Sequence, residues 1–188
     1  MLGGVHPTVR YCQNMPGTRI NAIRMKLLPV VITTILVLWS GGLVAQKTLP
    51  DVTLKTLDGR TVRVRDYAGK GKITVVSFWA TWCSPCKREL DAIKEHYPEW
   101  KRKYGVELLA ISIDIQQHLP KVAPMVAAKG WPYTILSDAT ANLKNALQFQ
   151  SIPKTLLLNQ KGHIVYEHTG YAEGDEVQLG ERIKWLAR

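Results

Sequence analysis

The residues best suited to chemistry are two cysteines, Cys83 and Cys86, which are separated by two residues. They follow a run of apolar and β-branched residues and precede a helical pattern, so both sulfurs should lie on the first turn of a helix. Unpaired N–H groups and the helix dipole favour an anion at Cys83. Such a position makes a thiol a nucleophile, and Lys87 and Arg88 add to the effect. Cys86 lies deeper in the turn and is suited to resolve a mixed disulfide.

Two other interpretations fit the cysteine spacing alone. A cysteine pair can be half of a zinc site, but the sequence has no second pair and no nearby His-x-x-x-His. The pair can also form an inert structural disulfide, although a bridge that closes so short a loop constrains the unfolded chain little. Pro85 fits the first helical turn, where the missing N–H of proline is not needed. The context therefore favours reversible redox chemistry.

The elements that must position the pair follow from the hydrophobic pattern. Residues 73–80 are nearly continuously apolar and β-branched, as in a central strand that is covered on both faces. The next apolar residues recur at steps of three and four, which predicts a helix over residues 84–104. The other expected elements are a hairpin of strands 52–57 and 61–64, strands 106–113, 133–136, 155–158 and 163–166, and helices 119–129, 138–149 and 173–187.

Alternating strands and helices, closed by a hairpin and a helix, predict an α/β fold with three layers. Helices should flank a central mixed sheet that carries an N-terminal β-hairpin. The 188 residues suit one domain. The formal net charge is +10; residues 1–45 hold basic residues and no acid, and beyond them basic and acidic residues alternate along the sequence. A nucleic-acid-binding face needs clustered basic residues with motif support, so we expect no nucleic-acid partner. Three tryptophans away from the cysteine pair are expected to pack in the core, namely Trp100, Trp131 and Trp185.

The N-terminal part has the pattern of an export signal. Met25 and a following lysine precede an apolar run over residues 27–39, and small residues lead up to Ala45. This order is typical of a signal peptide, so we interpret residues 25–45 as a signal peptide. An uncleaved signal anchor is the alternative, because Leu43 is a poor residue two positions before the cleavage point.

Both interpretations of this signal place residues 46–188, the expected folded domain, in the periplasm or another extracytoplasmic space. Residues 1–24 have neither an apolar run nor a packed-element pattern, and we interpret them as an over-extended start upstream of Met25. Cys12 would then be absent from the protein. The exported chain would hold an even number of cysteines, which suits an oxidising compartment.

The run from Phe78 to Lys87 resembles the active site of the thioredoxin superfamily. The similarity extends over nearly all of residues 50–188. The N-terminal hairpin, the extra segment near residues 113–130 and the run from Ser151 to Thr155 resemble the TlpA/ResA-like branch. That branch comprises exported thiol–disulfide oxidoreductases, which are often reductants for apocytochrome c or other extracytoplasmic thiols. The resemblance implies a thioredoxin-like fold, a dithiol that exchanges with protein substrates, and re-reduction by a membrane electron donor.

The resemblance also implies a substrate-binding surface. Pro153 corresponds to the family's cis-proline, which faces the cysteine pair, and the backbone of the preceding residue pairs with the bound substrate chain. Ile152 would then border the substrate groove. Trp82, Ser84 and Pro85 complete the candidate substrate contacts beside and between the cysteines. An ordinary trans proline at the start of a strand is the alternative, which base rates alone favour.

The acid–base residue of this site is expected on the helix. Thioredoxin has a buried Asp six residues before its first cysteine, and this chain has Ser77 at that position. Glu89 lies three residues after Cys86 on the same side of the helix. ResA-like reductases carry a glutamate there, where it is a candidate proton shuttle, and desolvation would raise its pKa toward the working range. The alternative is a solvated carboxylate beside Lys87 and Arg88.

A copper-binding chaperone on a thioredoxin fold is the alternative function. Such proteins usually space their cysteines by three residues, whereas two residues separate this pair. A thiol peroxidase would need a Pro-x-x-x-Thr-x-x-Cys arrangement that is missing here. We expect no metal site and no cofactor. The direction of electron flow depends on the reduction potential and stays open. The histidines of the expected domain share no ligand spacing, namely His96, His118, His163 and His168.

Overall fold

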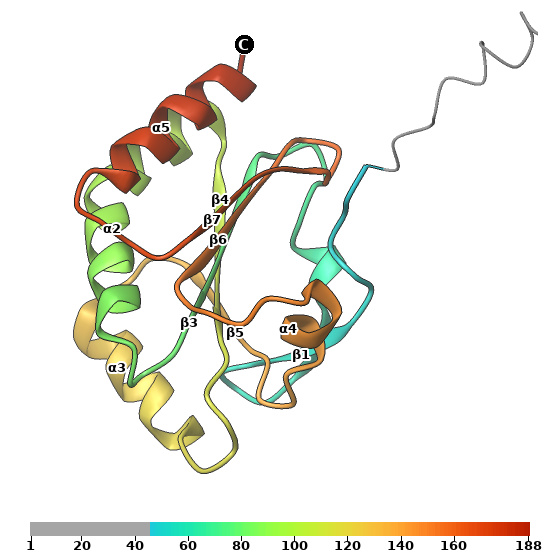
Figure 1. Ribbon diagram of the computed structural model, residues 1–188, viewed down its shortest axis with the longest axis vertical. Coiled ribbons are helices and arrows are strands. Elements are labelled where there is room, and N and C mark those ends of the chain that lie inside the picture. The colour runs from blue at the N-terminus through green and yellow to red at the C-terminus, as the bar shows by residue number, and fades with distance from the viewer. Residues whose placement is uncertain (1–45) are drawn as a thin grey trace, which may run out of the picture. The chain divides into compact units, whose positions relative to one another are not determined.

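The computed structural model describes residues 46–188, which form an α/β domain around one sheet (Figure 1). Within this range the sheet has seven strands in the order β2-β1-β5-β4-β3-β6-β7. The three central strands run parallel, whereas the pairs at both sides join them antiparallel, so the expected mixed sheet is present. The strands are β1 (Thr53–Thr56), β2 (Thr61–Arg63), β3 (Thr74–Trp79), β4 (Glu107–Ser112), β5 (Thr134–Ser137), β6 (Lys154–Leu158) and β7 (Ile164–Thr169).

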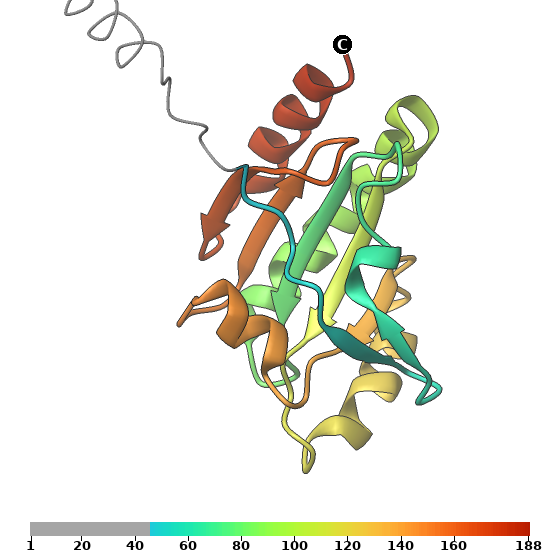
Figure 2. The same ribbon diagram turned by 90° about the vertical axis from the view of Figure 1, so that its right-hand side faces the viewer.

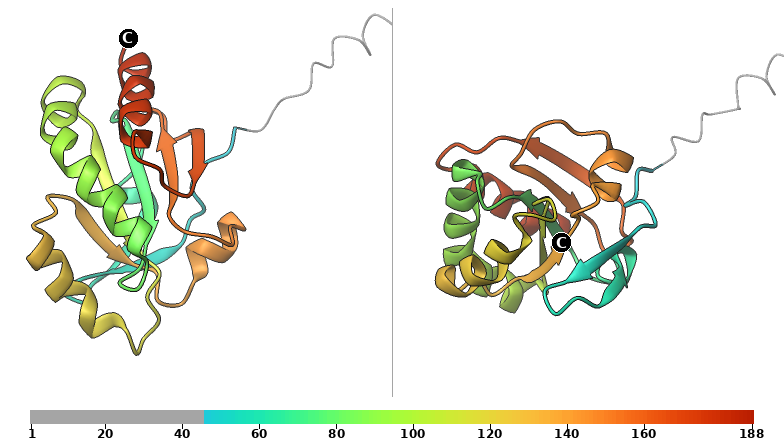
Figure 3. Two further views of the ribbon diagram at one scale, coloured as in Figure 1. Left: turned by 60° about the vertical axis from the view of Figure 1, so that its left-hand side comes forward. Right: turned by 90° about the horizontal axis from the view of Figure 1, so that it is seen from below.

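Helices cover both faces of the sheet, which gives the three expected layers (Figure 3). One face carries α2 (Ser84–Tyr104), α3 (Val122–Lys129) and α5 (Asp175–Leu186), with the 3-10 turn η2 (Leu119–Lys121) leading into α3. The other face carries α4 (Asn142–Leu147) and the 3-10 turn η1 (Val64–Asp66). Helix α2 ends because Gly105 takes a left-handed φ of 64° and donates its N–H to the carbonyl of Lys101.

The apolar core is divided by the sheet, because successive strand residues point to opposite faces. On the α2 face, Val75 and Trp79 pack with Leu90 and Ile93, and both cysteines belong to the same cluster. The indoles of Trp79 and Trp131 meet edge to face at 4.9 Å between ring centroids. On the α4 face the cluster is made by Val76, Phe78, Leu109, Ile111, Leu136, Leu143 and Leu156 together with their neighbours.

Two expectations about helices and packing are wrong. The helix expected to run from the cap Asp138 through Phe149 is the shorter α4, which begins at Asn142 and ends at Leu147. Asp138 does cap it as expected, because it accepts the N–H groups of Leu143 and Lys144. Its carboxylate thus caps the helix from outside. Trp185 is not a packing residue: it is 69% exposed near the end of α5, whereas Trp100 and Trp131 are buried as expected.

The described chain begins beside the edge strand β7. The carbonyl of Lys47 accepts the N–H of Ile164 at 2.7 Å, and Thr48 bridges to His163, so the entering segment runs along the hairpin (Figure 2). The interpretations of residues 1–24 and 25–45 lie outside the described residues. Within residues 46–188, no helix has both the length and the apolar character that crossing a membrane requires.

Candidate active site

The cysteine pair lies where β3 passes into α2. Cys83 occupies the N-cap position with an extended backbone, and its Sγ accepts the N–H of Cys86 at 3.3 Å. The two sulfurs form a disulfide, and the Cα atoms are 5.4 Å apart. Cys83 is 5% exposed and Cys86 is fully buried. Cys83 is therefore the more accessible sulfur, and it sits at the positive end of the helix dipole.

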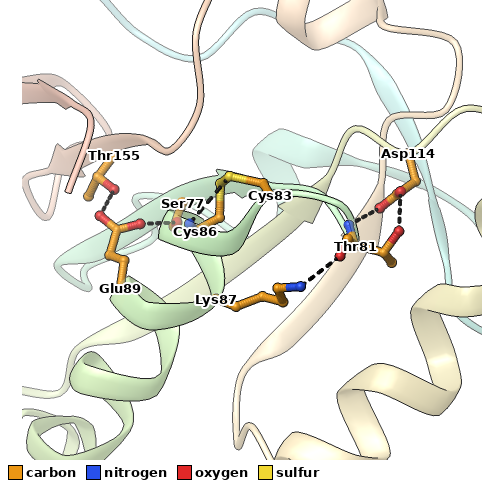
Figure 4. Close-up of a disulfide and its surroundings, with 8 residues drawn as sticks. All are labelled: Ser77, Thr81, Cys83, Cys86, Lys87, Glu89, Asp114 and Thr155. Carbon is orange, nitrogen blue, oxygen red and sulfur yellow. Dashed lines mark hydrogen bonds between the residues drawn. A yellow bond between two sulfur atoms is a disulfide. The ribbon is translucent and has the colours of Figure 1, made fainter.

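The loop before the cysteines is held by a buried carboxylate that sequence reasoning missed. Asp114 follows β4 and accepts the Thr81 N–H at 2.9 Å, the Thr81 hydroxyl at 2.7 Å and the Ser112 hydroxyl at 2.8 Å (Figure 4). From the other side, the Lys87 ammonium donates to the Thr81 carbonyl at 3.0 Å. Parallel β3 and β4 end at the same sheet edge, so an Asp two residues beyond β4 was a usable signal.

Glu89 is a buried carboxylate, so the alternative of a solvated helix residue is wrong. Its side chain points from α2 to the sheet, where it accepts the Ser77 hydroxyl at 3.0 Å and the Thr155 hydroxyl at 2.6 Å (Figure 4). The residue is only 4% exposed. Burial raises the pKa of Glu89 to about 7, although the two hydroxyl donors oppose the increase. The helix thus brings a carboxylate to Ser77, where thioredoxin has its acid on the strand.

The proline expected near the site, Pro153, directly precedes β6. The Ile152–Pro153 peptide bond is cis, as the resemblance implies. Lys154, the first residue of β6, is paired with Phe78 near the end of β3, so Pro153 lies at the same end of the sheet as the cysteine loop. Ile152 is half-buried and packs against the cluster that contains both cysteines.

Three more candidate substrate contacts surround the sulfurs. Trp82 is 59% exposed, whereas Trp79 on the preceding strand is fully buried. Ser84 is exposed and Pro85 half-buried on the first turn of α2. An exposed indole next to an accessible sulfur provides apolar surface for a protein chain.

The copper-chaperone alternative needed a third ligand near the cysteines. Within residues 46–188, no three side chains of His, Cys, Asp or Glu lie close enough together to hold a metal ion. The four histidines of this range lie apart from the cysteine pair in the sequence, namely His96 on α2, His118 directly before η2, and His163 and His168 on the β6–β7 hairpin.

The geometry of this site agrees with the similarity of the chain to known proteins. The profile of the AhpC/TSA family matches residues 45–167. The chain belongs to this family. It is 34% identical over 133 residues to the thiol-disulfide oxidoreductase ResA of Geobacillus kaustophilus, covering 70% of this chain and 72% of that protein. The ResA of Geobacillus thermodenitrificans is 33% identical over 132 residues, with the same coverage.

Solved structures support the same assignment. A thioredoxin-like protein from Porphyromonas gingivalis superposes with a TM-score of 0.67 at 42% identity, covering 74% of this chain and 91% of that one. StoA from Bacillus subtilis superposes with a TM-score of 0.57 at 27% identity, covering 71% and 96%. The expected thioredoxin-like, ResA-like thiol–disulfide oxidoreductase is thereby confirmed.

Proposed function

We propose that this chain reduces disulfides of extracytoplasmic proteins, with Cys83 as nucleophile and Cys86 as resolving thiol. The observation that carries this assignment is the asymmetry of the pair: Cys83 caps α2 at its positive end and is 5% exposed, while Cys86 is fully buried. A thiolate at a helix N-terminus is stabilised, and the accessible sulfur meets the substrate first.

The reaction proceeds in two exchanges. In the dithiol form, the Cys83 thiolate attacks one sulfur of the substrate disulfide, and the other substrate sulfur leaves as a thiolate that takes a proton from water. Cys86 then loses its proton and attacks the Cys83 sulfur. The Cys83–Cys86 bond forms, and the remaining substrate sulfur leaves as a thiolate that takes a proton from water. Two electrons and two protons have then passed to the substrate, which is released as a dithiol.

Glu89 is the proposed acceptor of the Cys86 proton. It lies three residues along the same helix, and with a pKa of about 7 its carboxyl group is partly ionised at neutral pH. A base near the working pH combines availability with driving force. Water reaches this part of the core poorly, because Glu89, Ser77 and Cys86 are all buried. The carboxylate thus offers Cys86 a base that bulk solvent does not.

The substrate chain is proposed to bind across Trp82, Ser84, Pro85, Ile152 and Pro153. The exposed indole and the half-buried Ile152 supply apolar contact, and the backbone of Ile152 supplies strand-like pairing. The substrate class is a protein thiol or disulfide outside the cytoplasm, with apocytochrome c as the proposed example. A membrane electron donor would return the oxidised pair to the dithiol form.

Export is part of the proposal and rests on the pattern of residues 25–45. Cleavage after Ala45 would release a mature chain that begins at Gln46, and an uncleaved segment would anchor the domain. N-terminal sequencing of the protein from the native host separates the two forms. A product that starts at Met1 and stays in the cytoplasm would contradict export.

The decisive experiment traps the mixed disulfide. In Cys86→Ser, Cys83 should accumulate covalent complexes with substrate proteins, which a reductant dissolves on gels. Cys83→Ser, the matched control, should trap nothing. The opposite pattern would show that the two roles are exchanged. The reduction potential of the pair then decides direction: about −270 mV supports a reductant, and about −120 mV an oxidant.

A further inference from the structure

A row of polar side chains crosses the sheet beneath α2. Ser77 on β3 is in register with Thr155 on β6, and Thr155 is in register with His168 on β7. Residues paired in this way project from the same face of a sheet. That face is the α2 face, because the first two hydroxyls both donate to Glu89. The row therefore leads from the buried carboxylate to the edge strand.

The neighbouring row on the same face has a different character. It consists of Val75, Leu157 and Tyr166, which lie in register on β3, β6 and β7 and pack in the α2-side cluster. Polar residues in the adjacent row interrupt this apolar packing, and burying a hydroxyl costs free energy unless it is hydrogen-bonded. The hydroxyls of the polar row are hydrogen-bonded to Glu89, so the row and the carboxylate stabilise one another.

A small cavity lies beside Glu89 and the outer two residues of the row, Thr155 and His168. Its walls include Glu89, Thr155, His168 and Asp175, and its volume is about 10 Å³. This is roughly the space that a single water molecule requires. Glu89 is 4% exposed, whereas the side chain of His168 is 33% exposed. The cavity is therefore lined both by a buried carboxyl group and by an imidazole ring that reaches solvent.

Asp175 holds the imidazole in place. Its Oδ2 lies 3.1 Å from Nε2 of His168 and also accepts the Ala172 N–H at 2.7 Å. A carboxylate next to one ring nitrogen fixes the orientation of the ring through the hydrogen bond that joins them. The charge of Asp175 also raises the pKa of Glu89, as a smaller contribution after burial.

We propose that His168, positioned by Asp175, relays the proton between Glu89 and bulk water during turnover. The proposal rests on the proposed function, in which Glu89 receives the Cys86 proton. After that transfer, protonated Glu89 gives its proton through the Thr155 hydroxyl and the cavity to the neutral His168 ring. The imidazolium then releases the proton to solvent. Glu89 returns to its carboxylate form, and no bond other than those to the proton changes.

The titratable and polar groups around Glu89 come from every element packed against it. The charges of these groups, other than His168 itself, are the same in the wild type and in a variant that changes only His168, so they do not account for a difference between the two proteins. The groups are Cys86 on α2, Ser77 on β3, Thr155 on β6, Tyr166 and His168 on β7, Asp175 and Glu176 on α5, Tyr171 before α5 and Tyr133 before β5.

The test compares His168→Gln with His163→Gln. Glutamine can keep a hydrogen bond to Asp175 but cannot carry a proton at neutral pH. His163 lies on the same hairpin, and its backbone N–H, not its ring, bonds Asn159. Reduced protein is mixed with a peptide disulfide, and the rate of the resolving step is followed from pH 5 to 9, in H₂O and D₂O, with and without added imidazole.

His168→Gln should slow resolution at neutral pH, by less than the roughly hundredfold that loss of a general base costs. Free imidazole should restore the rate, and the solvent isotope effect should increase. His163→Gln should match the wild type. Asp175→Asn, which keeps the ring, should give a smaller slowing that imidazole also relieves. This second variant keeps the test valid if His168→Gln does not fold.

Two results would overturn the relay. One is an unchanged pH profile of the resolving step in His168→Gln, when Glu89→Gln does change that profile. This result would leave the roles of the cysteines and Glu89 intact and would exclude His168 from the proton path. The other is a slowing that imidazole does not relieve, because that pattern belongs to a structural role. Failure of the proposed function would be detected by a different experiment. Cys86→Ser would then trap no substrate, independently of the results for His168.

Discussion

Two buried carboxylates flank the cysteine pair, and they are held in different ways (Figure 4). Asp114 is fully buried and accepts one backbone N–H and two hydroxyls. Glu89 is nearly as buried, but it accepts only two hydroxyls and borders a small cavity. A backbone N–H can only donate, whereas a hydroxyl can rotate and accept. The contacts of Asp114 therefore fix the loop before the cysteines, whereas Glu89 is the carboxylate that we propose exchanges a proton.

The largest expected effect is the loss of Asp114. Asp114→Ala leaves the Thr81 N–H and two hydroxyls without their acceptor in a fully buried place. Because an unsatisfied buried donor costs about 1–3 kcal/mol, we expect unfolding to become easier by roughly 3 kcal/mol. Urea denaturation of the oxidised protein at pH 7 measures the change.

The matched control for this variant is Asp114→Asn, which keeps one acceptor oxygen and should lose about half as much stability. If Asp114→Ala were as stable as the wild type, the contacts to Thr81 would contribute nothing net. Asp114 would then not be a carboxylate that stabilises the fold.

A second expected effect is the contribution of Glu89 to the pH dependence of stability. Its ordinary pKa is 4.5, and burial raises the folded-state pKa to about 7. Between these values the folded chain binds more protons than the unfolded chain, so stability falls as the pH rises. The interval corresponds to about 3 kcal/mol, present below pH 4.5 and lost by the time the pH has passed 7.

The comparison that isolates this effect uses Glu89→Gln, which cannot ionise. From pH 5 to pH 8 the wild type should lose stability relative to the variant. The unfolding free energy of the variant minus that of the wild type should therefore increase over this range. Every other titrating group is common to both proteins and cancels. Parallel curves for the two proteins would mean that Glu89 ionises at its ordinary pKa.

Local features of the site could be predicted from the sequence, and long-range ones could not. One continuous stretch of sequence contains the cysteine pair, the strand before it and the helix after it. Hydrophobic periodicity and helix-capping rules were therefore sufficient to predict these elements. The Thr155–Glu89 hydrogen bond spans 66 positions and the Thr81–Asp114 contacts span 33. Their existence depends on strand order and register, which periodicity does not determine.

The same limit explains the incorrect expectations. Glu89 could be placed on the Cys86 side of the helix, but whether that side faced solvent depended on β6 lying next to β3. Trp185 belongs to an amphipathic pattern, yet the apolar face of α5 that is buried contains Leu179 and Ile183 instead. Resemblance to a family supplied the cis-proline, which residue statistics alone would have rejected.

The smallest expected effect sharpens the comparison at Glu89 itself. Thr155→Val and Ser77→Ala each remove one hydroxyl donor to the carboxylate. Both donors stabilise the ionised form, so removing either should raise the pKa of Glu89 above about 7. A hydrogen bond contributes roughly 1 kcal/mol net, which corresponds to somewhat less than one pH unit. Thr155→Val should have the larger effect, because the Thr155 hydroxyl is the closer and stronger donor.

The protonated carboxyl of Glu89 has a C=O stretch that infrared difference spectra resolve, so its titration can be followed directly. Thr169→Val is the matched control, because Thr169 lies on β7 and is exposed; its midpoint should equal that of the wild type. A downward change in Thr155→Val would contradict the role given to the hydroxyls. It would mean that they favour the neutral carboxyl by accepting its proton, and the two flanking carboxylates would then differ less than their donors suggest.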